Sequence, residues 1–254
     1  MGFLIMDRTL YNHMARLDDV HWWYRGRRQI LEKYIERSAN LPTDARILEI
    51  GCGTGHNLAM LAKFGSVDAI EIDETSRVIA EGRLGREIYT SSLPELRDIS
   101  RNAYDMIALL DVLEHVEDDV AALRSMADCL KQGGKILITV PAHPWMWSNH
   151  DVVNHHHRRY TRKSLAKCLT KAGLRFDQLN YFNSLLFPIA VTQRLAAKVF
   201  GNESQGNATL PGPMNNLFEK IFVLERYAIG RFPLPLGLSL VTLVEPASTT
   251  PVSI

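Results

Sequence analysis

Cysteine is scarce in this chain, and its three residues, Cys52, Cys129 and Cys168, lie far apart. An odd number with wide spacing fits neither a disulfide framework nor a zinc knuckle, so a reducing, cytoplasmic environment is expected. A run of about eighteen apolar residues, which a membrane-spanning helix would need, is also missing. The N-terminus lacks the basic region and long apolar stretch of a signal peptide.

An excess of charge of one sign is absent too, since the formal net charge of the 254 residues is +1. Such a balance gives no general attraction to nucleic acid or to an acidic membrane surface. Hydrophobic residues make up 46% of the chain, which is enough for a full core. The length fits one α/β domain with additions, or one domain with a small lobe.

The most informative stretch is residues 46–55. It begins with a short apolar run, typical of a buried parallel strand, at Ile47, Leu48 and Ile50. Glycines then occupy alternate positions, and a helical pattern begins at about His56. The stretch therefore predicts a strand, a glycine-rich turn and a helix, which is where doubly wound α/β proteins bind nucleotides.

The glycine spacing separates this turn from a dinucleotide-binding fingerprint. That fingerprint would need its third glycine at position 56, which is His56. Instead, Glu49 lies two residues before the first glycine, and residues 67–71 predict a second strand that ends in Glu71. A carboxylate at this position can accept hydrogen bonds from both hydroxyls of a ribose.

The combined pattern resembles the class I S-adenosylmethionine-dependent methyltransferases of the small-molecule or lipid type. In that family the glycine turn holds the methionine part of the cofactor, and the acid after the second strand holds the ribose. The resemblance implies S-adenosyl-L-methionine as cofactor and S-adenosyl-L-homocysteine as product. A glycine-rich turn in another kind of α/β protein is the competing interpretation. The cofactor-binding residues that the resemblance implies are Glu49, Gly51, Cys52, Gly53, Gly55, Glu71, Ile72, Ser92, Leu93, Asp111, Val112 and His115.

Two later segments extend the resemblance. Residues 104–110 predict a strand that runs into the segment 111–118, which resembles the family's loop beside the cofactor. We expect His115 in this loop to line the pocket and order the loop rather than to catalyse. Residues 91–94 fall where relatives contact adenine, but the acid that many of them carry is missing, so a serine hydroxyl is expected to replace it.

The segment 141–160, after the expected fifth strand, is rich in histidine and tryptophan. One interpretation is a substrate loop, with Trp145, Trp147 and Tyr160 around the substrate and a histidine as general base. A second is a metal site built from His150, Asp151 and some of His155–His157, and a third is a solvated basic connector. We favour the first and expect no metal, because three consecutive histidines diverge in direction. The candidate bases are His143, His150 and His157.

A cluster of aromatic residues and arginines at 21–28 interrupts the helical pattern of residues 7–38. It is either a helix cap packed on the core or a lid over the active site. In the second case Trp22 and Trp23 would face the substrate, and Arg27 would bind an anionic group. We expect residues 1–40 to form an N-terminal helical lid and residues 41–254 to form the methyltransferase domain.

The predicted fold class is α/β, with a doubly wound, mostly parallel seven-stranded sheet. The resemblance implies the strand order 3-2-1-4-5-7-6, with strand 7 antiparallel. Residues 183–235 would form a helical insertion between strands 6 and 7. The apolar part of this insertion, 183–199, is too short to span a bilayer. It is open to three interpretations: a lid helix, a dimer surface, or a patch that dips into lipid.

The main hypothesis is methyl transfer to a small-molecule or lipid-like acceptor. The protein would be a cytoplasmic monomer or homodimer, with peripheral membrane contact through 183–199. One alternative is an RNA methyltransferase that uses the basic face of 158–171. However, no specific nucleic acid is expected as a partner, because the charge is near neutral and an Asn/Asp-Pro-Pro-aromatic motif is missing after the fourth strand. The other alternative is a non-catalytic partner protein that binds the cofactor.

Overall fold

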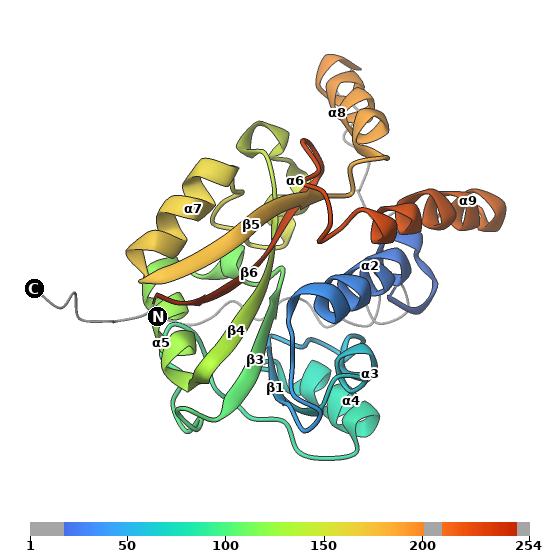
Figure 1. The fold of residues 1–254 in the computed structure, drawn as a ribbon. Helices are drawn as coiled ribbons and strands as arrows, with labels where there is room; N and C mark the ends of the chain where they lie inside the picture. The colour runs from blue at the N-terminus through green and yellow to red at the C-terminus, as the bar shows by residue number, and fades with distance from the viewer. Residues whose placement is uncertain (1–17, 201–209, 248–254) are drawn as a thin grey trace, which may run out of the picture.

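The computed structural model describes residues 18–200 and 210–247. These residues form a twisted sheet with helices on both faces (Figure 1). The sheet order is β2-β1-β3-β4-β6-β5. The strands are β1 (Arg46–Ile50), β2 (Ser66–Ile70), β3 (Tyr104–Leu110), β4 (Leu130–Pro141), β5 (Leu174–Phe182) and β6 (Ser239–Pro246).

The strand pairing confirms the predicted fold class. Strands β2, β1, β3 and β4 are parallel, whereas β6 is antiparallel to both of its neighbours, β4 and β5. The expected third strand is reduced to a single bridge between Tyr89 and Ile70, so the described sheet has six strands instead of seven. The physical reason is that Ile88 alone in this segment is buried, while Glu87 and Tyr89 are exposed.

The helices follow the predicted pattern, with some changes in length. The helix expected over 56–64 is shorter in the structure, where α3 covers only Leu58–Leu61 and the residues on either side form turns. Helix α7 (Arg162–Lys171) begins directly after the predicted N-cap Thr161. The helices are α2 (Trp22–Ser38), α3 (Leu58–Leu61), α4 (Glu74–Leu84), α5 (Asp119–Cys129), α6 (Asn149–Val153), α7 (Arg162–Lys171), α8 (Phe187–Phe200) and α9 (Gly212–Val223). Short 3-10 helices are η1 (Leu113–His115), η2 (Pro144–Met146) and η3 (Leu224–Tyr227).

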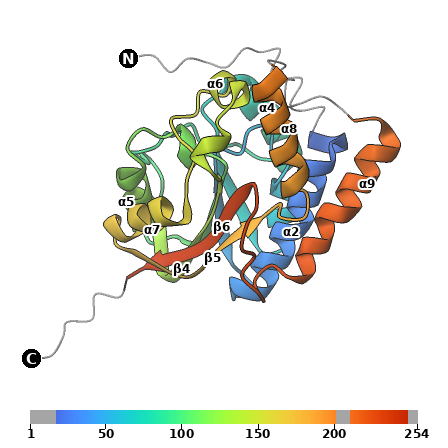
Figure 2. The same cartoon turned by 90° about the horizontal axis from the view of Figure 1, so that it is seen from above.

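Helix α2 is packed into the core together with the insertion helix α9, which lies alongside it (Figure 2). A Cβ on Gly26 would lie 2.6 Å from Cδ1 of Phe222, so the two helices approach closely at this point. The Trp22 amide donates to Oδ1 of Asn215 at 2.9 Å. The N-terminal helix is therefore held by a segment almost two hundred residues later; residues 7–17 of its expected length lie outside the described residues.

Helix α8 stands away from the sheet beyond the end of β5 (Figure 1). Its side chains at Ile189 and Leu195 are exposed. Among the helices in the described ranges, none combines the length and apolar character needed to cross a bilayer.

Candidate functional site

The glycine turn after β1 combines tight packing with open space. Gly51, Gly53 and Gly55 all have positive φ angles, of 69°, 54° and 84°. A Cβ on Gly51 would lie 2.8 Å from Cγ2 of Val112, and one on Gly55 would lie 2.8 Å from Cδ1 of Leu58. A Cβ on Gly53 would meet no heavy atom of the described residues within 4 Å. The outer glycines are thus needed for packing, and the central one leaves its backbone open to a ligand.

The carboxylate of Glu71 is held against this turn. Oε2 accepts a hydrogen bond from the Gly53 amide at 2.7 Å, and Oε1 accepts one from the Asp73 amide at 2.9 Å. Burial raises the pKa of Glu71, while these amide donors oppose the rise. Ile72, the next residue, is 49% exposed and presents an apolar surface beside the carboxylate.

Glu49, at the start of the same motif, is buried under the turn. Oε1 accepts a hydrogen bond from Nδ2 of Asn57 at 2.8 Å. Oε2 is buried without a hydrogen-bond partner in the described part of the chain. Burial raises the pKa of Glu49 to about 7.

Glu49→Gln is expected to stabilise the protein above pH 7. A carboxyl with a raised pKa in the folded state contributes stability that is present below its unfolded pKa and is lost as the pH rises through about 7. Glutamine cannot ionise, so the variant should be more stable than wild type at pH 8, by about 1–3 kcal/mol, and nearly equal in stability at pH 4, below the unfolded pKa of 4.5. Urea unfolding of both proteins at the two pH values checks this. An equal difference at pH 4 and pH 8 would contradict it.

A cavity of about 510 Å³ opens beside the turn, at the carboxyl ends of β1, β3 and β4. The first turn of α2, the η1 loop, the α6 segment and α8 form its other walls. Of the residues predicted from sequence, those that line it are Gly51, Cys52, Gly53, Asp111, His115, His150, Trp22, Trp23 and Arg27.

Arg27 ties helix α2 to the ends of the strands. Nη2 lies 2.7 Å from Oδ2 of Asp111, forming a partly buried ion pair, and donates to Oγ1 of Thr139 at 3.1 Å. The guanidinium also lies 5.0 Å from the centre of the Trp23 ring. Asp111 takes a positive φ of 56° directly after β3, which directs the chain into the η1 loop.

Asp151 organises the segment between β4 and α7. It is fully buried, and its two oxygens accept hydrogen bonds from Arg159 at 2.6 and 3.0 Å. The Ser148 amide donates to it at 2.9 Å, and Nδ1 of His156 lies 3.0 Å from Oδ1. Burial alone would raise the pKa of Asp151, but the hydrogen bonds with His156 and Arg159 hold it well below its usual range.

Several predicted substrate and base residues lie elsewhere. Nε2 of His143 is 3.0 Å from the Gly237 carbonyl oxygen, and the Tyr160 hydroxyl donates to Oδ2 of Asp119 at 2.8 Å. His157 is exposed to solvent. The predicted residues that do not line the cavity, among those the structure describes, are His143, His157, Trp145, Trp147, Tyr160, Glu49, Gly55, Glu71, Ile72, Ser92, Leu93 and Val112.

The expected adenine loop lies beside the sheet and not in the cavity. The Ser91 hydroxyl is buried and donates to the carbonyl oxygen of Arg97 at 2.8 Å, so it is engaged within its own loop. Ser92 is partly exposed, and Leu93 packs against the core. Ser92, unlike Ser91, is therefore placed to offer a hydroxyl outside the loop.

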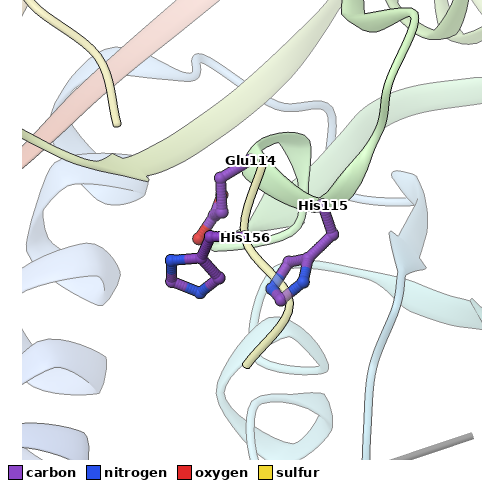
Figure 3. Close-up of side chains that lie close together, drawn as sticks. All are labelled: Glu114, His115 and His156. Atoms are coloured by element: carbon purple, nitrogen blue, oxygen red, sulfur yellow. The ribbon is translucent and has the colours of Figure 1, made fainter. Parts of the chain in front are cut away.

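The structure also groups residues that sequence reasoning did not connect. Glu114, His115 and His156 lie together at the cavity wall, with one ligand-type atom of each within 4.8 Å of the others. In Figure 3 the Glu114 carboxylate points toward the His156 ring, and the His115 ring lies beside them. The sequence offered a partial signal, because an acid and a histidine are adjacent in the η1 loop. Further lining residues that were missed come from separate elements: Asp18, Tyr24, His56, Asn57, Arg159, Arg194 and Ser239.

Comparison with known proteins identifies the family. A family model described as a methyltransferase domain matches residues 22–179, more than half of the chain. A ubiquinone biosynthesis O-methyltransferase from Xanthomonas axonopodis pv. citri is 30% identical over 104 residues, which cover 39% of this chain and 44% of that protein. A probable S-adenosylmethionine-dependent methyltransferase from Mycobacterium tuberculosis is 27% identical over 127 residues, which cover 49% of this chain and 44% of that protein. The match thus spans less than half the length of these relatives.

Solved structures share the fold at low sequence identity. An S-adenosylmethionine-dependent methyltransferase from Clostridium acetobutylicum has a TM-score of 0.60 and 13% identity, over 94% of this chain and 100% of that chain. The strand order, the glycine turn and the acid after β2 agree with this family assignment. The chain therefore belongs to the methyltransferase-domain family and is of the class I, S-adenosylmethionine-dependent type.

Proposed function

We propose that this protein transfers the methyl group of S-adenosylmethionine to a small-molecule or lipid-like acceptor. The observation that carries the proposal is the Glu71 carboxylate, held against an open glycine turn at the edge of a cavity of about 510 Å³. Ligands of open α/β sheets bind at this edge, outside the carboxyl ends of the strands.

The residues around the turn fit the cofactor. The open backbone at Gly53 gives room for its amino-acid part, and Glu71 can exchange its bond with the Gly53 amide for the ribose hydroxyls. Ile72 and the loop at Ser92 and Leu93 would flank the adenine. Asp111 also lines the cavity, where its carboxylate is paired with Arg27. When bound, S-adenosylmethionine supplies a methyl group on a sulfonium, a leaving group that departs as a neutral thioether.

The acceptor would occupy the part of the cavity between the first turn of α2 and α8. Trp22 and Trp23 supply an aromatic wall there, and we retain the lid interpretation for the described part of the N-terminal segment. Of the three candidate bases, His150 lines the cavity, and burial lowers its pKa, which favours the neutral imidazole that accepts a proton. The exposed apolar residues of α8 make peripheral lipid contact a proposal for the insertion.

The activity named for the Xanthomonas relative, O-methylation in ubiquinone biosynthesis, fits a hydroxyl acceptor on a lipid-like molecule. A radiolabelled methyl-transfer assay tests the proposal, with S-adenosylmethionine as donor. Phenols, carboxylic acids and amines carrying short isoprenoid chains are offered as acceptors, and total RNA is offered in parallel. We expect label in the organic extract, reduced at least tenfold in His150→Ala. Label in RNA alone, or no label in any fraction, would contradict the proposal.

A further inference from the structure

We propose that Glu114, His115 and His156 bind a divalent transition-metal ion in the wall of the cavity. An open coordination position of this ion would take an oxygen atom of the acceptor. The metal site rests on the geometry of the three side chains, and only its role toward the acceptor rests on the proposed function.

The first argument is the set of ligands and their approach. A carboxylate and two imidazoles form a donor set that Zn²⁺ and similar ions use. The ligand atoms lie within 4.8 Å of one another, and the rings of His115 and His156 have centroids 4.6 Å apart at 86° (Figure 3). Bond lengths of about 2.0–2.2 Å would bring these atoms to roughly 3.0–3.6 Å, which small side-chain rotations can supply.

The second argument is the unpartnered oxygen of Glu114. This side chain is 1% exposed, and its Oε2 atom is buried with no hydrogen-bond partner among the residues of 18–200 and 210–247. The nearby guanidinium groups are engaged elsewhere, since Arg27 pairs with Asp111 and Arg159 pairs with Asp151. A buried carboxyl oxygen without a partner is unfavourable, and a bound cation would provide that partner.

The third argument is the orientation of His156. Its Nδ1 atom lies 3.0 Å from Oδ1 of Asp151, and Asp151 is itself fixed by Arg159 and Ser148. This leaves Nε2 of His156 as the atom that can bind an ion. In metal-binding histidines the second ring nitrogen usually donates a hydrogen bond to a carboxylate or a carbonyl oxygen. This bond fixes the orientation of the ring and makes the metal-binding nitrogen more basic.

The location of the cluster gives the ion a role. All three side chains line the cavity, so a three-ligand ion would keep an open position that faces the acceptor. An ion lowers the pKa of a hydroxyl that it binds. The hydroxyl proton would pass to His150, the oxygen would form a bond to the methyl carbon, and the carbon–sulfur bond would break with its electron pair on sulfur.

Metal titration of the full chain tests this site directly. The protein is stripped with a chelator, and any affinity tag is removed because histidine tags bind the same ions. Zn²⁺ binding is measured by calorimetry and Co²⁺ binding by visible absorption. We expect one ion per chain in wild type, and binding at least tenfold weaker in Glu114→Gln and His156→Asn. His155→Asn, an exposed histidine of the same segment, is the matched control and should bind as wild type does.

The outcomes separate this proposal from the proposed function. Wild type that binds no ion, or Glu114→Gln and His156→Asn that bind as wild type does, would overturn the metal site. Should the buried Glu114→Gln variant fail to fold, His115→Asn at the exposed η1 position provides the same test. Affinity for S-adenosylmethionine is measured in the same samples. Its absence with metal binding intact would contradict the proposed function and leave the metal site standing.

Discussion

Asp151→Ala is expected to lower the free energy of unfolding by about 3–5 kcal/mol, because it leaves Arg159 with an uncompensated charge. Asp151 is fully buried and accepts two hydrogen bonds from Arg159 and one from the Ser148 amide. Asp151 connects Ser148, His156 and Arg159, so the position of the middle of the segment between β4 and α7 depends on this carboxylate. Urea unfolding in the presence of a chelator measures the loss without a contribution from bound metal.

Two comparison variants make the Asp151 result specific. Asp177→Ala removes a carboxylate from an exposed position on β5 and should change stability by less than about 0.5 kcal/mol. Asp151→Asn keeps an oxygen for the Ser148 amide but removes the charge, so its loss should be intermediate. A loss below 1 kcal/mol in Asp151→Ala would show that Asp151 does not anchor the segment.

Glu71→Gln is expected to weaken S-adenosylmethionine binding. The loss should be about 10- to 150-fold for each hydrogen bond between a ribose hydroxyl and the ionised carboxylate that the substitution removes. Hydrogen bonds to an ionised group contribute about 1.5–3 kcal/mol each, and the carboxylate can accept from both hydroxyls. Glutamine retains one oxygen, which can accept from the Asp73 amide, whereas its NH2 group is a donor and replaces the oxygen that accepts from the Gly53 amide. Calorimetric titration of variant and wild type gives the ratio of affinities.

The matched control for Glu71 is Glu74→Gln, which removes the same charge from an exposed site in the first turn of α4. Its affinity should equal that of wild type. If the two variants were equally weak, a general electrostatic effect would explain the loss. If Glu71→Gln bound as tightly as wild type, the ribose role of Glu71 would be wrong.

The parts of the fold that could be predicted are those that depend on local sequence patterns. Gly51 and Glu71 each follow directly after one of two strands that pair in parallel, and this pairing places the acid beside the turn. The weak third strand could not be separated from a bridge, because only Ile88 in it faces the core. Whether such a segment forms a strand depends on its neighbours and not on its own pattern.

The candidate site was harder to predict, because irregular segments take their side-chain directions from tertiary contacts. His143 adopts a φ of 62° and contacts the Gly237 carbonyl, and the turn that follows leaves Trp145 48% exposed. His156, in contrast, is directed into the cavity wall by Asp151. No sequence spacing predicts a contact between His156 and Glu114, because β4 separates them in the sequence and they approach each other only in the folded protein.

The measurement that tests the central claim most directly is calorimetric titration of the purified protein with S-adenosylmethionine and with NAD. The glycine turn, the buried Glu49 and Glu71 predict one site per chain with micromolar affinity for S-adenosylmethionine and no binding of NAD. Binding of NAD alone, or of neither ligand by a folded sample, would contradict the assignment of the turn as a methyl-donor site.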